Sequence, residues 1–400
     1  MPPAPFTLTD ALRAKARQLG FALVGVTPAV SPTGVSRLNE WLERGYGGEM
    51  EYLAARQAAY EHPRHVLDGV RSIVMLGLPY RTAEPRQPQA GEGRISRYAF
   101  GNGDYHDVIH DKLRELIAAL QELAPAAHAR GVVDTAPLLE REFAQLAGLG
   151  WIGKHTLLIN KPAGSYFFLA ALLTDQELTP DEPFAADHCG TCRACLDACP
   201  TNAFPQPYVL DATRCISYLT IELRGPIPRD LRSGVGEWLF GCDVCQEVCP
   251  WNQHTERHGG RSLQEGAVGN ALRGVPASRG GVPAADAAFH PAPGADPIDL
   301  IALFQLDDEG FRRRFRHTPL WRAKRRGILR NAAIVLGNQR AIAATAALIG
   351  GLKDAEPLIR GASAWALGKI GDVACRRALT ERSMVESDAD VRAEIAAAIG

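Results

Sequence analysis

Eight of the nine cysteines of this 400-residue chain lie in the range 189–249, where their spacing could bind iron–sulfur clusters. The first group, Cys189–Pro200, follows the pattern Cys-x2-Cys-x2-Cys-x3-Cys-Pro, and the second, Cys242–Pro250, follows Cys-x2-Cys-x3-Cys-Pro. Cys215 stands alone between the two groups. A [4Fe–4S] cluster needs four thiolate ligands, so the eight cysteines supply two complete sets. The segment is therefore predicted to move electrons, although the spacing does not say what receives them.

The order of these cysteines predicts which of them share a cluster. In the bacterial ferredoxin pattern, the last cysteine of each run ligates the cluster of the other run. The first ligand set is then Cys189, Cys192, Cys195 and Cys249. The second set is Cys199, Cys242, Cys245 and, as the one cysteine left in the region, Cys215. The ninth cysteine, Cys375, lies in an alanine-rich helical segment and is expected to be a small core residue.

Zinc and disulfides are the alternatives for these cysteines, and both fit less well. Zinc ribbons pair Cys-x2-Cys units across loops and do not use the run that ends in Cys-Pro. Disulfides are typical of small secreted domains, whereas 400 residues can bury a core without them. Residues 1–10 lack the character of an export signal, and no apolar run approaches the roughly 20 residues of a membrane helix. We therefore expect a cytoplasmic protein of two or three domains without a membrane segment.

Residues 1–180 are predicted to form an α/β domain in which helices cover a sheet. Apolar, β-prone runs predict strands at Phe21–Val26, Ile73–Leu78, Gly131–Asp134 and Tyr166–Leu173. Apolar residues at a helical period predict helices at Leu8–Leu19, Val35–Leu42, Val108–Leu123 and Leu138–Ala147. The pattern leaves the order of the strands open.

Three further segments follow this domain. Residues 181–253 form the cluster module, with short helices expected between the cysteine turns. Residues 254–297 are rich in Gly, Pro, Ala and Ser, which predicts a linker. Residues 298–400 contain three similar apolar stretches that end in glycines 31 and 32 residues apart, at Gly337, Gly368 and Gly400. This period predicts stacked all-α helix pairs of the HEAT type.

Basic residues gather at the start of these repeats. Residues 312–330 contain eight arginines and one lysine but no acidic residue. Because the apolar stripes of the repeats should pack against one another, the arginines beside them are expected to face outward in a row. Aromatic residues among the cations favour a nucleic acid as the partner over a merely solvated basic face. The candidate binding residues are Arg322, Lys324, Arg325, Arg326 and Arg330.

Signals for chemistry in the α/β region are weaker. Asp134 could mark a helix entry, with Thr135 as N-cap and Pro137 in the first turn, or a carboxylic acid at the ligand-binding edge of a sheet. Burial at such an edge would raise its pKa and allow proton donation near neutrality. Spacing alone favours the helix entry. The glycine-rich segment Gly148–His155 and the polar loop Arg94–His106 are, by themselves, more typical of structural turns.

Several longer stretches carry a family resemblance. They are Gly47–Leu53, Arg97–Ala99, Asp104–His106, Val133–Arg141, Ala147–Lys154, both cysteine groups, Ile216–Glu222, Gly225–Pro228 and Arg330–Ala332. In these stretches the chain resembles the epoxyqueuosine reductases, which complete queuosine synthesis in tRNA. The likeness runs from about residue 10 to the end of the chain. Two departures concern the periphery: the segment 254–296 is longer and richer in glycine than expected, and the chain ends in mid-repeat.

The resemblance implies an oxidoreductase that reduces the epoxide of epoxyqueuosine, at the wobble position of the anticodon, to queuosine. It implies two [4Fe–4S] clusters and a cobalamin between the α/β domain and the ferredoxin-like module, with reduced cobalt attacking an epoxide carbon. Asp134 falls on the family's proton-donor position. The implied cobalamin contacts are Arg97, Asp134, Lys154, His155 and Ser217. Ile109 stands where a cobalt-ligating Asp-x-His-x-x-Gly motif would need glycine, which fits a cobalt without a histidine ligand.

The same resemblance makes the repeats a surface for tRNA, whose single-stranded anticodon bases can be splayed into a pocket. It implies a low-potential electron donor that the sequence does not identify, and we expect a monomer. Two alternatives stay open, namely a corrinoid reductase of the reductive dehalogenase type and a non-catalytic tRNA-binding iron–sulfur scaffold. Such dehalogenases usually carry a twin-arginine signal and lack a helical-repeat tail, unlike this chain.

Overall fold

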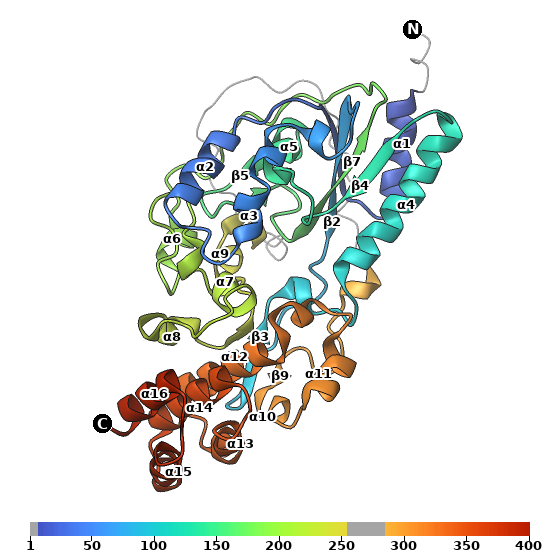
Figure 1. Ribbon diagram of the computed structural model, residues 1–400. Coiled ribbons are helices and arrows are strands. Elements are labelled where there is room, and N and C mark those ends of the chain that lie inside the picture. Colours follow the sequence, from blue (N-terminus) through green and yellow to red (C-terminus); the bar gives the residue numbers. More distant parts are fainter. Residues whose placement is uncertain (1–6, 254–284) are drawn as a thin grey trace, which may run out of the picture.

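A four-stranded antiparallel sheet forms the centre of the N-terminal region in the computed structural model, which describes residues 7–253 and 285–400 (Figure 1). Its strands lie in the order β1-β2-β7-β4. They are β1 (Leu23–Pro28), β2 (Ser72–Pro79), β7 (Phe167–Thr174) and β4 (Ala129–Val132). β2 is buried along its whole length because β1 and β7 pair with its two edges and helices cover its two faces.

Alternating side chains of β2 explain how the helices are placed on the sheet. Val74, Leu76 and Leu78 point to the core beneath α1 (Leu8–Gln18) and α4 (Tyr105–Leu123). Ile73 and Met75 point to the opposite core, which α5 (Glu140–Leu146) covers. Two further helices, α2 (Val35–Glu43) and α3 (Glu51–Ala55), precede β2. All four predicted strands and all four predicted helices of this region are therefore present, with ends shifted by a few residues.

The cluster module consists of short elements that lie between the sheet and the helical repeats in Figure 1. The small hairpin β5 (Trp151–Ile152) and β6 (Leu158–Ile159) precedes it. Its helices are α6 (Ala194–Asp197), α7 (Ile216–Ile221), α8 (Arg229–Val235) and α9 (Val244–Glu247). The predicted linker falls mostly on residues 254–284, which lie outside the described residues.

The C-terminal region stacks helices in two rows, as the repeat period predicts. The helices are α10 (Leu300–Leu303), α11 (Asp308–Phe315), α12 (Lys324–Gln339), α13 (Thr345–Gly351), α14 (Pro357–Ile370), α15 (Val373–Ser383) and α16 (Ala389–Ile399). α12, α14 and α16 pack side by side. The repeated glycines allow this approach, because a Cβ at Gly337 would come within 2.5 Å of Trp365, and one at Gly368 within 2.7 Å of Ala398.

A second sheet joins the three regions. β3 (Glu92–Ile95) from the α/β region pairs with β8 (Trp238–Phe240) of the cluster module on one side and with β9 (Ile298–Asp299) on the other. The segments that the sequence predicts as separate domains therefore share one sheet, in the order β8-β3-β9. Within the described ranges, no helix is both long and apolar enough to cross a lipid bilayer.

Candidate active site

The first predicted cysteine set comes together beneath a group of aromatic rings. Cys249 is buried with Trp151, and Cys189 packs against the same cluster. Burial and, after it, the charges of the neighbouring Cys249, Cys189 and Cys192 raise the pKa of the Cys195 thiol to about 11. These four sulfurs therefore lie near one another, although 57 residues separate Cys192 and Cys249.

The second predicted set gathers around the start of α7. Burial raises the pKa of Cys242 and of Cys245 well above the ordinary thiol value, and in both cases Cys215 contributes a repulsive charge. Cys199 acts in the same way on Cys215, which stands at the N-cap of α7. In the described part of the chain, no three His, Cys, Asp or Glu side chains converge on the position of a single metal ion. The two groups of four sulfurs fit the donor sets of two [4Fe–4S] clusters.

A chain of polar groups surrounds Asp134 at the N-terminus of α4. Asp104 caps this helix by accepting a hydrogen bond from the backbone N–H of His106, and its carboxylate lies 2.6 Å from Nδ1 of the same histidine. Nε2 of His106 lies 2.8 Å from Oδ1 of Asp134, and the hydroxyl of Tyr105 donates to Oδ2. The Tyr105 ring is stacked between His106 and Phe168, which fixes its position.

The charges in this chain determine where its proton resides. Burial lowers the pKa of His106, but hydrogen bonds to Asp104 and Asp134 outweigh that effect and raise it to about 9. Partial desolvation raises the pKa of Asp134, but the hydrogen bond and charge of His106 and the hydrogen bond from Tyr105 lower it overall. At neutral pH, His106 is therefore a cation and Asp134 is ionised.

Three expectations about Asp134 are therefore wrong. Its pKa lies below the ordinary value because His106 compensates the desolvation. The helix-entry interpretation fails too, since α5 begins only at Glu140, after an N-cap at Leu139 that makes no side-chain hydrogen bond. The rule for ligand sites at the carboxyl edge of parallel sheets does not apply either, because the sheet is antiparallel. The sequence signal that was available was the pair Asp104 and His106 at a helix N-terminus.

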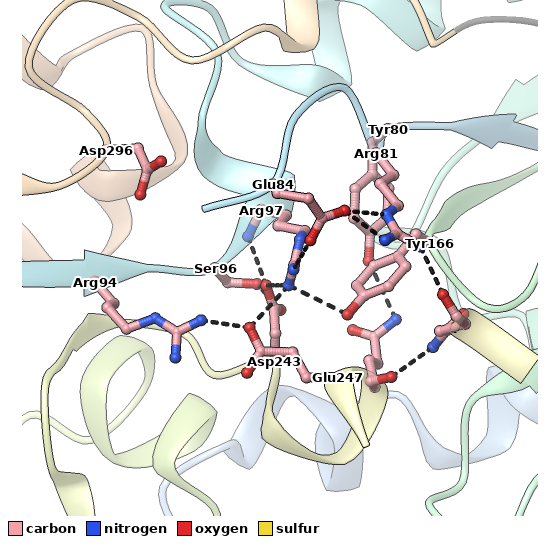
Figure 2. A network of polar contacts seen from close by, with 12 residues as sticks. Tyr80, Arg81, Glu84, Arg94, Ser96, Arg97, Tyr166, Asp243, Glu247 and Asp296 are labelled. Carbon is pink, nitrogen blue, oxygen red and sulfur yellow. Dashed lines mark hydrogen bonds and ion pairs between the residues drawn. The ribbon is translucent and has the colours of Figure 1, made fainter. Parts of the chain in front are cut away.

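Arg97 occupies the centre of a buried network between the α/β region and the second cysteine group (Figure 2). Its guanidinium donates to Glu247 at 2.9 Å, to Tyr166 at 3.2 Å and to Glu84 at 3.2 Å. Its backbone N–H donates to Asp243 at 2.8 Å. Asp243 and Glu247 alternate with the cysteines of the second group, so the network fixes that loop. Only Nε of Arg97 is buried without a partner.

The predicted cofactor residues of the glycine-rich turn have different surroundings. The ammonium of Lys154 donates to the carbonyl oxygens of Gly190 at 2.5 Å and Cys192 at 2.8 Å, which braces the first cysteine loop. Burial lowers the pKa of His155 to about 4, so its ring is neutral, and its Nε2 is buried without a hydrogen-bond partner. Ser217 is half-buried in the first turn of α7. A buried nitrogen without a partner marks a position where a polar ligand would be favourable.

The prediction that Arg330 contacts tRNA is wrong. Arg330 is 1% exposed, and its guanidinium donates to the backbone carbonyl oxygens of Leu219, Leu223 and Gly225 at 2.6 to 2.8 Å. Arg360, on the next repeat, is also buried and forms an ion pair with Glu386, in the loop before α16. Arg330 and Arg360 therefore do not belong to the predicted outward-facing row, because they satisfy polar groups inside the fold, whereas Arg392 of the last repeat is exposed.

The other predicted basic residues remain at the surface or near it. Arg325 forms an ion pair with Asp354 at 2.6 Å, and Arg322 binds Glu222 at 2.5 Å. Lys324 is exposed, with its ammonium 4.1 Å from the centre of the Trp321 ring. Arg326 lines a groove of about 470 Å³ between α8 and the helices α12, α14 and α16.

The fold and site together define an iron–sulfur oxidoreductase with a helical-repeat domain. Three family models match the chain: a 4Fe-4S double cluster binding domain over residues 188–252, epoxyqueuosine reductase over residues 61–135, and HEAT repeats over residues 322–400. The epoxyqueuosine reductase of Pseudomonas aeruginosa is 40% identical over 84% of this chain and 87% of its own length. The epoxyqueuosine reductase of Escherichia coli is 35% identical over 88% of this chain and 86% of its own length.

Solved structures agree with these relatives. A crystal structure of epoxyqueuosine reductase with an epoxyqueuosine-modified stem loop of tRNA-Tyr has a TM-score of 0.85 and 31% identity, and the match covers 98% of both chains. The Bacillus subtilis enzyme, with its catalytic aspartate loop swung out of the active site, has a TM-score of 0.83 and 30% identity over 98% of both chains. The chain belongs to the epoxyqueuosine reductase family.

Proposed function

We propose that the chain reduces the epoxide of epoxyqueuosine, at the wobble position of tRNA anticodons, to the alkene of queuosine. The observation that carries this proposal is the short connection between Asp134 and the second cysteine group. Tyr98 packs edge-on against Tyr105, beside Asp134, and its ring lies tilted against Phe240, two residues before Cys242. Burial raises the pKa of Tyr98, and the charges of both Asp134 and Asp243 raise it further. Tyr98 therefore connects Asp134, the proposed acid, with the second cysteine group, the proposed redox centre.

The cofactors of this family are two [4Fe–4S] clusters and cobalamin. We assign one cluster to Cys189, Cys192, Cys195 and Cys249, and the other to Cys199, Cys215, Cys242 and Cys245. Cobalamin would be held by His155 and Ser217, and by Nε of Arg97, since the unpartnered nitrogens of His155 and Arg97 fit its polar periphery. When bound, these groups supply single electrons and a strongly nucleophilic cobalt. Lys154 supports the site through the first cysteine loop.

The chain's own residues supply the acid chemistry and the docking surface. Asp134 would donate a proton to the oxygen released from the epoxide. Lys324 and Arg326, with Arg322 and Arg325 beside them, would contact tRNA phosphates, and the relative solved with a tRNA stem loop supports a tRNA substrate. We further propose that a low-potential donor delivers the electrons and that the enzyme works as a monomer.

The test is Asp134→Asn, which keeps the size of the side chain but cannot donate a carboxylic proton. In an anaerobic assay with epoxyqueuosine-containing tRNA and a chemical reductant, we expect a loss of turnover of about 10²- to 10⁴-fold. The corrin and cluster absorption bands should stay unchanged. Asp107→Asn removes the same charge from an exposed position on α4 and is the matched control. Full activity of Asp134→Asn would contradict the proposed role.

A further inference from the structure

The reaction needs more protons than Asp134 holds. Converting an epoxide to an alkene breaks two C–O bonds and releases the oxygen as water, so each turnover consumes two electrons and two protons. Asp134 is ionised at neutral pH in this fold, because its hydrogen bonds to His106 and Tyr105 outweigh desolvation. It must therefore receive each proton from a neighbour before it can pass that proton on.

His106 is placed to be that neighbour. Its Nε2 lies 2.8 Å from Oδ1 of Asp134, and its Nδ1 lies 2.6 Å from Asp104. Asp104 is in turn fixed as the N-cap of α4, and the stacked ring of Tyr105 holds the imidazole from one side. The His106 side chain is 28% exposed, so water can return a proton to it after each transfer.

Resting on the proposed function, we propose that His106, oriented by Asp104, is the residue that supplies protons to the substrate through Asp134. A proton moves from Nε2 of His106 to Oδ1 of Asp134 and then to the oxygen of the opening epoxide. His106 stays neutral with its Nδ1–H bonded to Asp104 until solvent reprotonates Nε2. A second passage delivers the proton with which the oxygen leaves as water.

The groups around His106 keep the proton on its ring until the substrate draws it through Asp134. Asp104 and Asp134 face its two nitrogens, and both favour the imidazolium. Tyr105 donates to Asp134 and keeps its own proton, because burial and then the charge of Asp134 raise its pKa. The charge of Arg322 also lowers the pKa of Asp134. Burial raises the pKa of Glu140 to about 8, but no hydrogen bond joins Glu140 to Asp134, so it has no direct path for a proton.

The test is the pH dependence of queuosine formation in anaerobic single-turnover reactions of the cofactor-loaded enzyme. His106 is protonated below its pKa, so the wild-type rate should fall as the pH rises through about 9. Asp104→Asn keeps a good N-cap but removes one of the charges that raise this pKa. We expect the fall in rate at alkaline pH, the alkaline limb of the profile, to occur at least one pH unit lower in this variant. His106→Gln can donate to only one of the two carboxylates and cannot titrate, so the fall in rate near pH 9 should vanish and the rate should fall about 10²- to 10⁴-fold.

An independent readout is the ring ¹³C shift of His106 in labelled protein without substrate, assigned by its loss in His106→Gln. It should titrate near pH 9 in the wild type and at least one unit lower in Asp104→Asn. Asp107→Asn and His110→Gln, on the same helix, should leave both the limb and the titration unchanged. If the rate of both Asp104→Asn and His106→Gln fell with pH as in the wild type, this inference would be overturned. The proposed function would still stand, because the wild type forms queuosine. A wild type that forms no queuosine would overturn the proposed function itself.

Discussion

At the scale of single residues, the proton that we propose for catalysis rests on His106 and not on Asp134, to which His106 is hydrogen-bonded. The sequence resemblance pointed to Asp134, but it could not show that His106, 28 residues away, would lie 2.8 Å from it. Only the packing of α4 beside β4 brings the two together. The cysteines were more predictable, because ligand spacing within a turn is a local property. In the structure, Cys195 lies near Cys189, Cys192 and Cys249, and Cys242 lies near Cys215 and Cys245.

Among the eight predicted cluster ligands, Cys215 has the weakest sequence signal. Replacing it therefore tests the predicted ligand set of the second cluster. Cys215→Ser should lose the second cluster and retain the first, because only one set loses a thiolate. Anaerobically purified wild type should contain about eight iron atoms per chain and the variant about four. Cys375→Ser, which changes the buried cysteine of α15, is the matched control and should keep the full iron content. Unchanged iron in Cys215→Ser would show that another ligand completes the second cluster.

At the scale of elements, helix α12 links the repeats to the redox centre. It is buried from Gly327 to Gly337, so Arg330, the one cation of that stretch, faces protein and not solvent. Asn331 donates to the carbonyl oxygens of Thr220 at 2.8 Å and Leu239 at 2.9 Å, while Arg330 satisfies the carbonyls that follow α7. The sequence could predict the helix, but a run of arginines in a helix looks the same whether it binds phosphate or caps another helix.

Replacing Arg330 should therefore affect folding and not only tRNA affinity. Arg330→Ala removes the guanidinium donor from one buried and two partly buried carbonyl oxygens, and we expect a loss of about 3–5 kcal/mol in stability. Since α7 follows Cys215 directly, the second cluster should also become easier to lose. The thermal midpoint of the cofactor-loaded protein and its iron content after dialysis measure the two effects. The exposed Arg392→Ala is the control, and an equally small change in both variants would contradict this role.

At the scale of the whole molecule, the surface for tRNA should be narrower than the basic composition of residues 312–330 suggests. Lys324 and Arg326 carry charges that the described ion pairs do not neutralise, and they lie at the junction of the repeats and the cluster module. Replacing both by alanine should weaken tRNA binding and lower the slope of log K against log salt by about one per lost phosphate contact.

The control for this double variant removes the same charge from the outer row of helices. Arg376 and Arg377 lie on α15, which does not line the groove. Their replacement by alanine should leave both the affinity and the salt slope nearly unchanged. If both double variants weakened tRNA binding equally, only the total charge would matter. The surface around Lys324 and Arg326 would then not be the docking surface.

The sheet shared by β8, β3 and β9 limits how this protein can be engineered. A fragment that stopped after the cluster module would leave one edge of β3 open, and it would remove Asp296, which accepts from the backbone of Arg86, and Gln339, which accepts from Gly91. A chimera that takes its helical repeats from another species must therefore import the short strand β9 together with them. Otherwise the junction of the chimera would interrupt the hydrogen bonds between β3 and β9.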